Sequence, residues 1–123
     1  MTTWTPDEID AVGRAHELDI ATRRTDGSLR RSVIVWAVRH GPDLYVRSVN
    51  GRGSAWFRGV ADRHEGHISS GGVDRDVAFL DIGDELADAL DAAYRAKYGA
   101  TSSAVAHITS SQARAATLRL VPR

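Results

Sequence analysis

The stretch Arg31–Ser48, RSVIVWAVRHGPDLYVRS, decides the fold of this chain. Its first half, Arg31–Arg39, carries apolar side chains on both faces, which is typical of a strand covered on both sides or of a small barrel. A turn signal over 40–43 follows, and Leu44–Ser48 then returns as a second strand. Because this connection is too short for a crossover, we expect an antiparallel hairpin at the centre of a small barrel.

Alternating and helical patterns continue on both sides of the hairpin. Strands are expected over 18–23, 66–70, 75–82 and 116–121, and helices over 5–15, 54–63 and 84–98, with one or two helical turns within 101–110. We expect Asp84 to cap the third of these helices, Asp91 to pair with Arg95 four residues later, and Gly99 to end it. Short connections favour antiparallel pairing, so the patterns alone predict a small α+β domain.

Composition narrows the class of protein. The 123 residues are enough for one domain, and 16 basic residues balance 16 acidic ones. This balance argues against a dedicated nucleic-acid binder and against attraction to anionic membranes. The chain has no cysteine, and neither a signal peptide nor a membrane-spanning run is evident, so we expect a cytoplasmic protein.

The glycine-rich turn after the hairpin is the candidate binding site. Polar side chains gather there within eight residues, with glycines between them: Arg47, Ser48, Asn50, Arg52 and Ser54, with Gly51 and Gly53. Glycines let backbone N–H groups approach a ligand, and Ser54 is a suitable N-cap for a helix that carries Trp56. A helix N-terminus beside arginines favours an anion such as phosphate. The alternative is an ordinary turn with solvated arginines, and Trp56 stands where a dinucleotide fingerprint needs its third glycine.

Other polar groupings are weaker candidates. The run His64-Glu65-Gly66-His67 does not match HExxH, and Gly66 argues against a helix there, so a solvated turn is expected and no metal site. Asp74, Asp76 and Asp81 can act as paired carboxylates only if the fold brings two of them together. The lone histidines His16 and His107 are expected to be surface or core residues.

The order of these elements resembles that of the flavin-binding split-barrel proteins, relatives of pyridoxamine-phosphate oxidase and of deazaflavin-dependent nitroreductases. More narrowly, the chain is similar to an uncharacterised bacterial family of unknown function within that superfamily. Four segments carry this resemblance: VIVWAVRHGPDLYVRSVNGRGSAWFR, GGVDRDVAF, DAAYRAKYG and ATLRLVPR. The resemblance implies a small antiparallel split β-barrel with three or four peripheral helices, forming a single domain over 1–123.

The same resemblance implies a cofactor, either FMN or an 8-hydroxy-5-deazaflavin. Its binding residues would be Arg31, Trp36, Arg47, Ser48, Asn50, Arg52, Gly53, Ser54 and Trp56. Three features depart from the deazaflavin branch: Asn50 replaces a common lysine, Ser54-Ala55 replaces a His-Pro pair, and Phe57 replaces a common tyrosine.

Two functions are consistent with these features. The first is an oxidoreductase that transfers hydride between the cofactor and a small-molecule substrate. The second is a cofactor-free split-barrel binding or interaction module without catalytic activity. Split barrels commonly pair, so a homodimer is expected.

Overall fold

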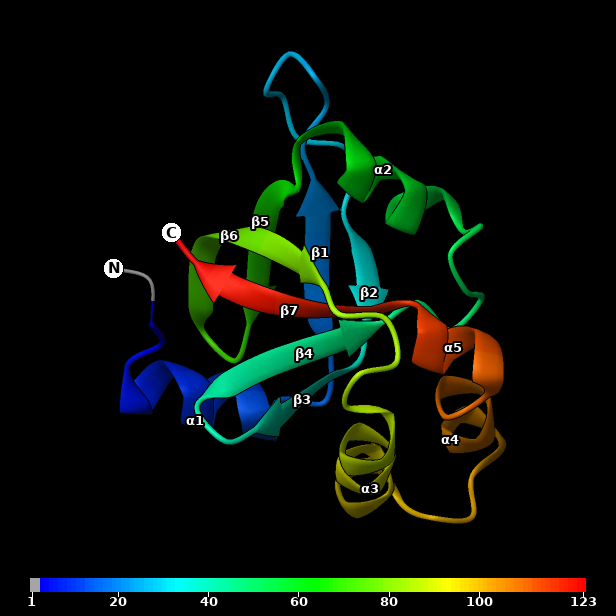
Figure 1. Cartoon of the computed structure of the whole chain (residues 1–123). Helices are drawn as coiled ribbons and strands as arrows, with labels where there is room; N and C mark the ends of the chain where they lie inside the picture. The colour runs from blue at the N-terminus through cyan, green and yellow to red at the C-terminus, as the bar shows by residue number, and fades with distance from the viewer. Residues whose placement is uncertain (1–2) are drawn as a thin grey trace.

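Figure 1 shows the computed structural model of the chain, which describes residues 3–123. The strands are β1 (Leu18–Thr22), β2 (Val33–Val35), β3 (Ala37–His40), β4 (Asp43–Arg47), β5 (Glu65–Ser70), β6 (Val73–Asp81) and β7 (Thr117–Pro122). The helices are α1 (Pro6–Arg14), α2 (Ala55–Arg63), α3 (Ala87–Tyr98), α4 (Ser103–Ile108) and α5 (Ser111–Ala115). The strands form one antiparallel sheet in the order β2-β1-β5-β6-β7-β4-β3, rolled into a nearly closed barrel. The predicted α+β split barrel is confirmed, although five helices rather than three or four surround it over the described residues.

The long apolar stretch is divided in two at Trp36. Its first part, β2, pairs with β1, whereas its second part, β3, pairs with β4. The expected antiparallel hairpin is therefore present only between β3 and β4, and it lies at one end of the strand order rather than at the centre. Because one residue connects the two end strands of the sheet, this segment forms the seam of the barrel.

Helix α3 stabilises the break in the stretch. The carbonyl oxygen of Trp36 accepts a hydrogen bond from the Tyr94 hydroxyl at 2.8 Å, and the Trp36 ring stacks on Tyr98 with ring centroids 3.9 Å apart. The next carbonyl, that of Ala37, accepts from Lys97 Nζ at 2.6 Å. Side chains of α3 thus donate to the backbone carbonyls on both sides of the junction between β2 and β3.

The interior of the barrel is filled by side chains that point inward from successive strands. They include Ile20, Val46, Ile68, Val77 and Leu118, each at most 1% exposed. Helix α2 packs against β1 through Gly59, where an added Cβ would lie 2.8 Å from Thr22 Oγ1. Gly59 weakens the helix by about 1 kcal/mol, but this close packing leaves no room for a larger residue.

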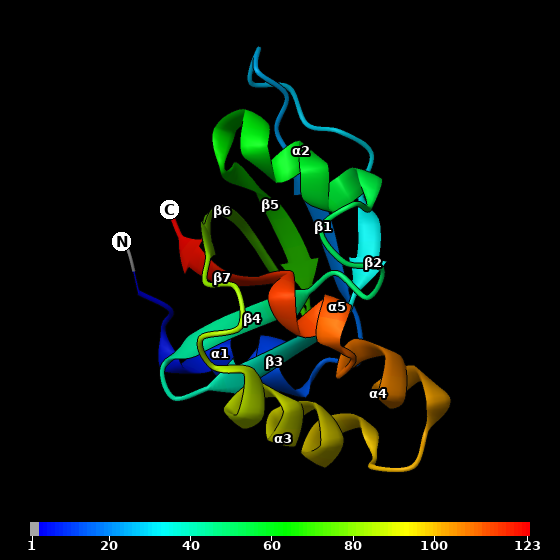
Figure 2. The same ribbon diagram turned by 45° about the vertical axis from the view of Figure 1, so that its right-hand side comes forward.

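The remaining helices group together on one side of the barrel. Figure 2 shows α3, α4 and α5 next to one another, with α2 across the opposite end. Helix α3 begins at Ala87, because the segment before it forms a turn in which the Ala87 N–H donates to the Asp84 carbonyl at 3.1 Å. The expectation that Asp84 caps this helix is therefore wrong. Within residues 3–123 we find no helix with the length and apolar character of a membrane span.

Candidate functional site

A cavity of about 280 Å³ lies at the seam of the barrel. It is lined by Ile34, Val35, Trp36, Arg47, Val49, Trp56, Ala104, His107 and Ile108. These residues come from the end of β2 and the residue that joins it to β3, from the end of β4 and the loop after it, and from α2 and α4. Ile34 is 60% exposed and Val49 is 37% exposed, so apolar surface continues onto the rim. The volume is close to the lower end of the usual range for small-molecule sites, about 300–1,000 Å³.

Two tryptophans give the cavity flat aromatic walls. The ring of Trp36 is held parallel to Tyr98, with an interplanar angle of 1°. The ring of Trp56 meets Phe57 edge-on, with centroids 5.8 Å apart and an angle of 77°. Because ring contacts within the protein support both indoles, the walls suit a planar apolar ligand.

The loop between β4 and α2 leaves most of its N–H groups without a protein acceptor. Gly51 N donates to the Ser48 carbonyl at 2.9 Å, and Ser54 N donates to the Gly51 carbonyl at 3.4 Å. Between residues 3 and 123, no acceptor is found for the N–H groups of Val49, Asn50, Arg52 and Gly53. Gly51 has a φ of +83°, and an added Cβ would lie 3.3 Å from Gln112 Cβ, so this tight turn requires glycine.

The first turn of α2 is not capped by a side chain. Ser54 occupies the N-cap position, as the sequence predicts, but its hydroxyl pairs with the Ser48 hydroxyl at 2.6 Å instead of accepting from the helix. The first N–H groups of the helix, including that of Trp56, therefore remain free to meet an anion. Because Trp56 also lines the cavity, the aromatic wall and the uncapped helix end belong to one region.

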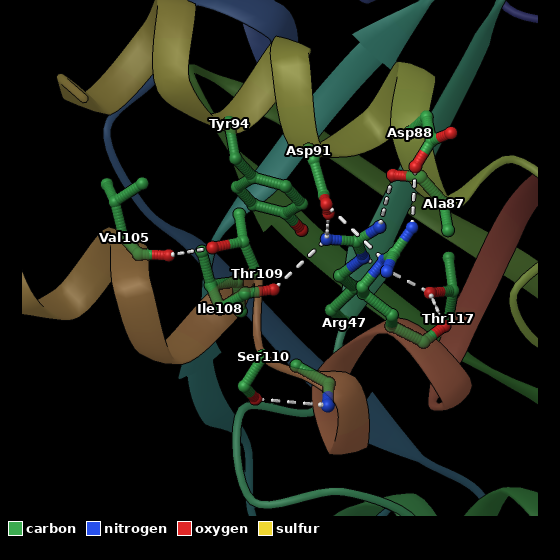
Figure 3. A network of polar contacts seen from close by, with 12 residues as sticks. Arg47, Ala87, Asp88, Asp91, Tyr94, Val105, Ile108, Thr109, Ser110 and Thr117 are labelled. Carbon is green, nitrogen blue, oxygen red and sulfur yellow. Dashed lines mark hydrogen bonds and ion pairs between the residues drawn. The ribbon is translucent and has the colours of Figure 1, made fainter.

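Arg47 is buried and bonded on every side (Figure 3). Its Nη1 donates to Asp91 Oδ1 at 2.6 Å and to the Ile108 carbonyl at 3.1 Å. Its Nη2 donates to the Ala87 carbonyl at 3.1 Å, and its Nε donates to Thr117 Oγ1 at 3.3 Å. These bonds join β4 to α3, α4 and β7, and they hold the helical wall of the cavity.

No sequence signal points to the ion pair between Arg47 and Asp91. The spacing predicts that Asp91 pairs with Arg95, yet Asp91 is buried and faces Arg47 and Arg114. Arg47 and Asp91 are separated by 44 positions in the chain, so only the fold brings them together.

Arg52 does not line the cavity and is bonded to other parts of the protein. Its Nη2 meets Asp81 Oδ2 at 2.5 Å, its Nη1 donates to the Ala115 carbonyl at 2.8 Å, and its guanidinium lies over the Phe57 ring. The hydrogen bond to Asp81 raises the pKa of Arg52, and the same bond lowers the pKa of the Asp81 carboxyl. The Arg52 side chain remains 54% exposed, so an anion in solvent can reach it.

The structure thus brings together only part of the predicted set. Trp36 and Trp56 share the cavity, and the loop that contains Asn50 and Gly53 lies beside it. Ser48 is buried beneath the loop, where its hydroxyl donates to the Gly51 carbonyl at 2.6 Å. Arg31 precedes β2 and is exposed. Arg47 and Arg52 direct their guanidinium groups to different protein partners rather than to one point.

His107 was not expected to be a site residue, yet it lines the cavity. It belongs to α4, on the face that also presents Ala104 and Ile108. The spacing i, i+3 and i+4 is the signal that could have placed the three on one helical face. Only the fold shows that this face meets the barrel seam.

The fold also brings two of the three aspartates together. Asp74 and Asp76 lie on the same face of β6 and both contact the ring of His67, whose Nδ1 is 2.8 Å from Asp76 Oδ1. The hydrogen bond to Asp76 raises the pKa of His67. His64 ends α2 with a left-handed φ of 56°, and over residues 3–123 no three metal-ligating side chains form a group.

Comparisons with known proteins agree with this architecture. The structure is similar to an F420 reductase with a TM-score of 0.60 and 14% identity, over 93% of this chain and 90% of that one. It is also similar to the conserved hypothetical protein Rv2991 from Mycobacterium tuberculosis, with a TM-score of 0.68 and 12% identity, over 99% of this chain and 82% of that one. At identities of 12–14%, the likeness shows a shared fold and nothing further.

Sequence comparisons give one family. Curated proteins provide no match to the chain. A family model described as "Uncharacterized protein conserved in bacteria (DUF2255)" matches residues 8–120. The match spans nearly the whole chain, and the protein therefore belongs to the bacterial DUF2255 family.

Proposed function

We propose that this protein binds a phosphorylated flavin or 8-hydroxy-5-deazaflavin at the barrel seam and transfers hydride between that cofactor and a small molecule. One observation carries the proposal: the cavity with two tryptophan walls lies directly beside a loop and a helix end whose N–H groups lack protein acceptors. An apolar slot suits a tricyclic ring, and free backbone N–H groups suit a phosphate.

The ring would lie against Trp36 and Trp56, with Ile34 at the rim of the cavity. Neither aspartate nor glutamate lines this cavity, so an electron-rich ring edge would meet no negative side chain. A flavin or deazaflavin bound here supplies the hydride chemistry itself, and the protein supplies position and exclusion of water.

The phosphate would be held by the loop of residues 49–53 and by the first turn of α2. Asn50 and Arg31 are exposed and can add side-chain donors, and the Ser54 hydroxyl lies where the loop meets the helix. Arg52 would reach the phosphate by exchanging its bonds to Asp81. Arg47 has no part in this ligand set, because its donors hold α3 and α4.

The direct experiment titrates the purified protein with FMN, with riboflavin and with the deazaflavin cofactor, following quenching of tryptophan fluorescence. We expect the phosphorylated ligands to bind more tightly than riboflavin. Gly53→Asp should weaken phosphorylated ligands by about fivefold or more, because a negative charge about 4 Å from a phosphate costs roughly 1–4 kcal/mol. Gly53→Ala is the matched control, since nothing lies within 4 Å of an added Cβ there.

A second variant tests whether Arg52 exchanges its bonds to Asp81 for bonds to the phosphate. Removing a hydrogen bond to a charged group costs about 1.5–3 kcal/mol, so Arg52→Ala should weaken FMN binding by roughly 10- to 150-fold and riboflavin binding little. Arg95→Ala, an exposed arginine on α3, should leave both affinities unchanged. Equal losses for FMN and riboflavin would contradict a role of Arg52 at the phosphate.

The alternative function makes a different prediction. A cofactor-free binding module would give no quenching with any of the three ligands at concentrations up to about 1 mM, which corresponds to a binding free energy weaker than about −4 kcal/mol. That result would overturn the proposed function and leave the fold unaffected.

The proposal includes a homodimer. Ile34 and Val49 leave apolar surface at the rim of the cavity, and surface of this kind is often covered by a partner. A stable dimer with a sub-micromolar Kd requires more than about 8 kcal/mol of binding free energy. Light scattering of the protein at tens of micromolar (roughly) should give the mass of a dimer, and the mass of a monomer would contradict this part of the proposal.

A further inference from the structure

We propose that His107 is the proton donor of the seam cavity, an inference that rests on the proposed function. Of the residues that line the cavity, only Arg47 and His107 can carry a positive charge, and neither Asp nor Glu is among them. A hydride transfer to a polarised double bond leaves negative charge on an atom of the substrate, and that atom needs a proton. The cavity therefore has two candidates for its source.

Arg47 is excluded by its bonds and by its chemistry. Its guanidinium is engaged by Asp91, by two backbone carbonyls and by Thr117. An arginine guanidinium also does not give up a proton in proteins. Arg47 can position the wall of the cavity, but it cannot supply the proton.

His107 is free to act. Its side chain is exposed, and in the described part of the chain its ring has no hydrogen-bond or ion-pair partner. Helix α4 is nevertheless fixed: Ser102 caps its start through the Val105 N–H at 3.1 Å, and Val105 and Ile108 are buried. The Ile108 carbonyl is held by Arg47 at 3.1 Å. An imidazole without a partner among residues 3–123, on a fixed helix beside an apolar slot, is placed to hand a proton to a bound substrate.

The proposed reaction has two parts, a hydride transfer and a proton transfer. Hydride, with its electron pair, passes from the reduced flavin or deazaflavin, which is thereby oxidised, to carbon of the substrate. In a carbonyl substrate a new C–H bond forms, the C=O π bond breaks, and its electron pair moves to oxygen. In a conjugated enone the hydride adds to the β-carbon, the C=C electron pair shifts to form a double bond to the carbonyl carbon, and the C=O electron pair moves to oxygen. The His107 imidazolium donates a ring proton to that oxygen, so an N–H bond breaks and an O–H bond forms. Neutral His107 then takes a proton from water.

The experiment compares labelling and turnover. Diethyl pyrocarbonate modification of His107 is followed by peptide mass spectrometry, in protein alone and in protein saturated with cofactor and cyclohex-2-enone. Occupancy should slow modification of His107 at least tenfold and leave His40 unchanged, because His40 is exposed in β3 outside the cavity. In single-turnover reduction of the enone, His107→Gln should be slower by about 100-fold, the lower end for loss of a general acid, and His40→Gln should equal wild type.

The outcomes separate this inference from the proposed function. If the cofactor fails to bind wild type in the fluorescence titration, the proposed function and this role both fall. If the cofactor binds and His107 is labelled equally fast in free and occupied protein, the role of His107 is overturned while the proposed function stands. Equal turnover by His107→Gln and wild type overturns it as well. Where wild type does not reduce the enone, the labelling comparison decides alone.

Discussion

Replacing Arg47 with methionine should destabilise the protein severely without acting at a ligand. Methionine keeps an unbranched apolar chain, but it removes every donor that Arg47 presents to Asp91, Ala87, Ile108 and Thr117. The Asp91 side chain is only 9% exposed, and its remaining partner would be Arg114 Nε at 3.3 Å.

The magnitude follows from this burial. Removing one partner of a buried ion pair costs about 3–5 kcal/mol, since the other charge stays buried, here with only Arg114 Nε beside it at 3.3 Å. We therefore expect Arg47→Met to lower the free energy of unfolding by about 4 kcal/mol. Arg47→Met/Asp91→Leu removes the stranded carboxylate and should recover part of that loss. It should not recover all of it, because the Ile108 carbonyl loses the donor that Arg47 supplies, at about 1–3 kcal/mol.

Urea unfolding followed by tryptophan fluorescence and by circular dichroism measures these differences. Arg95→Met is the matched control, an identical change at an exposed site, and should stay within about 0.5 kcal/mol of wild type. A loss of less than about 1 kcal/mol in Arg47→Met would refute the reasoning from burial. The reasoning would also be refuted if Arg47→Met had wild-type stability but bound FMN weakly, because that result would make Arg47 a phosphate ligand.

Three further outcomes follow from the structure. The hydrogen bond to Asp76 raises the pKa of His67. The stabilisation of the fold by this pair is therefore fully present below the unfolded pKa of 6.5 and is lost as pH rises through the folded pKa. The difference in unfolding free energy between wild type and His67→Asn, measured by urea unfolding across pH, should shrink over that rise. Gly59→Ala should lower the melting temperature in spite of its better helix propensity, since the new methyl would lie 2.8 Å from Thr22 Oγ1, with a cost of about 1–3 kcal/mol. Burial lowers the pKa of Lys97 from 10.5 to about 8, so the stability of wild type relative to Lys97→Met should rise between these pH values, and a flat profile would contradict this.

Local sequence signals determined where most elements begin and end. Thr5 and Glu8 form the reciprocal capping box that starts α1, and Gly99 ends α3 with a φ of 95°. The strands β1, β4, β5, β6 and β7 lie within two residues of the predicted spans, because alternation and turn residues act over short distances. The resemblance to split-barrel proteins implied that Trp36 and Trp56 are binding residues, and both line the cavity.

Tertiary structure alone decided the seam and the polar contacts of the site. Nothing in RSVIVWAVR marks Trp36 as a break, because its neighbours on both sides share the same apolar alternation. The Tyr94 hydroxyl that donates to the Trp36 carbonyl at the break lies 58 positions away. The partners of Arg47 and the place of His107 in the cavity likewise depend on helices far along the chain. Propensity, capping and turn chemistry act over a few residues, whereas strand pairing, buried ion pairs and cavity walls depend on which distant segments the folded chain brings into contact.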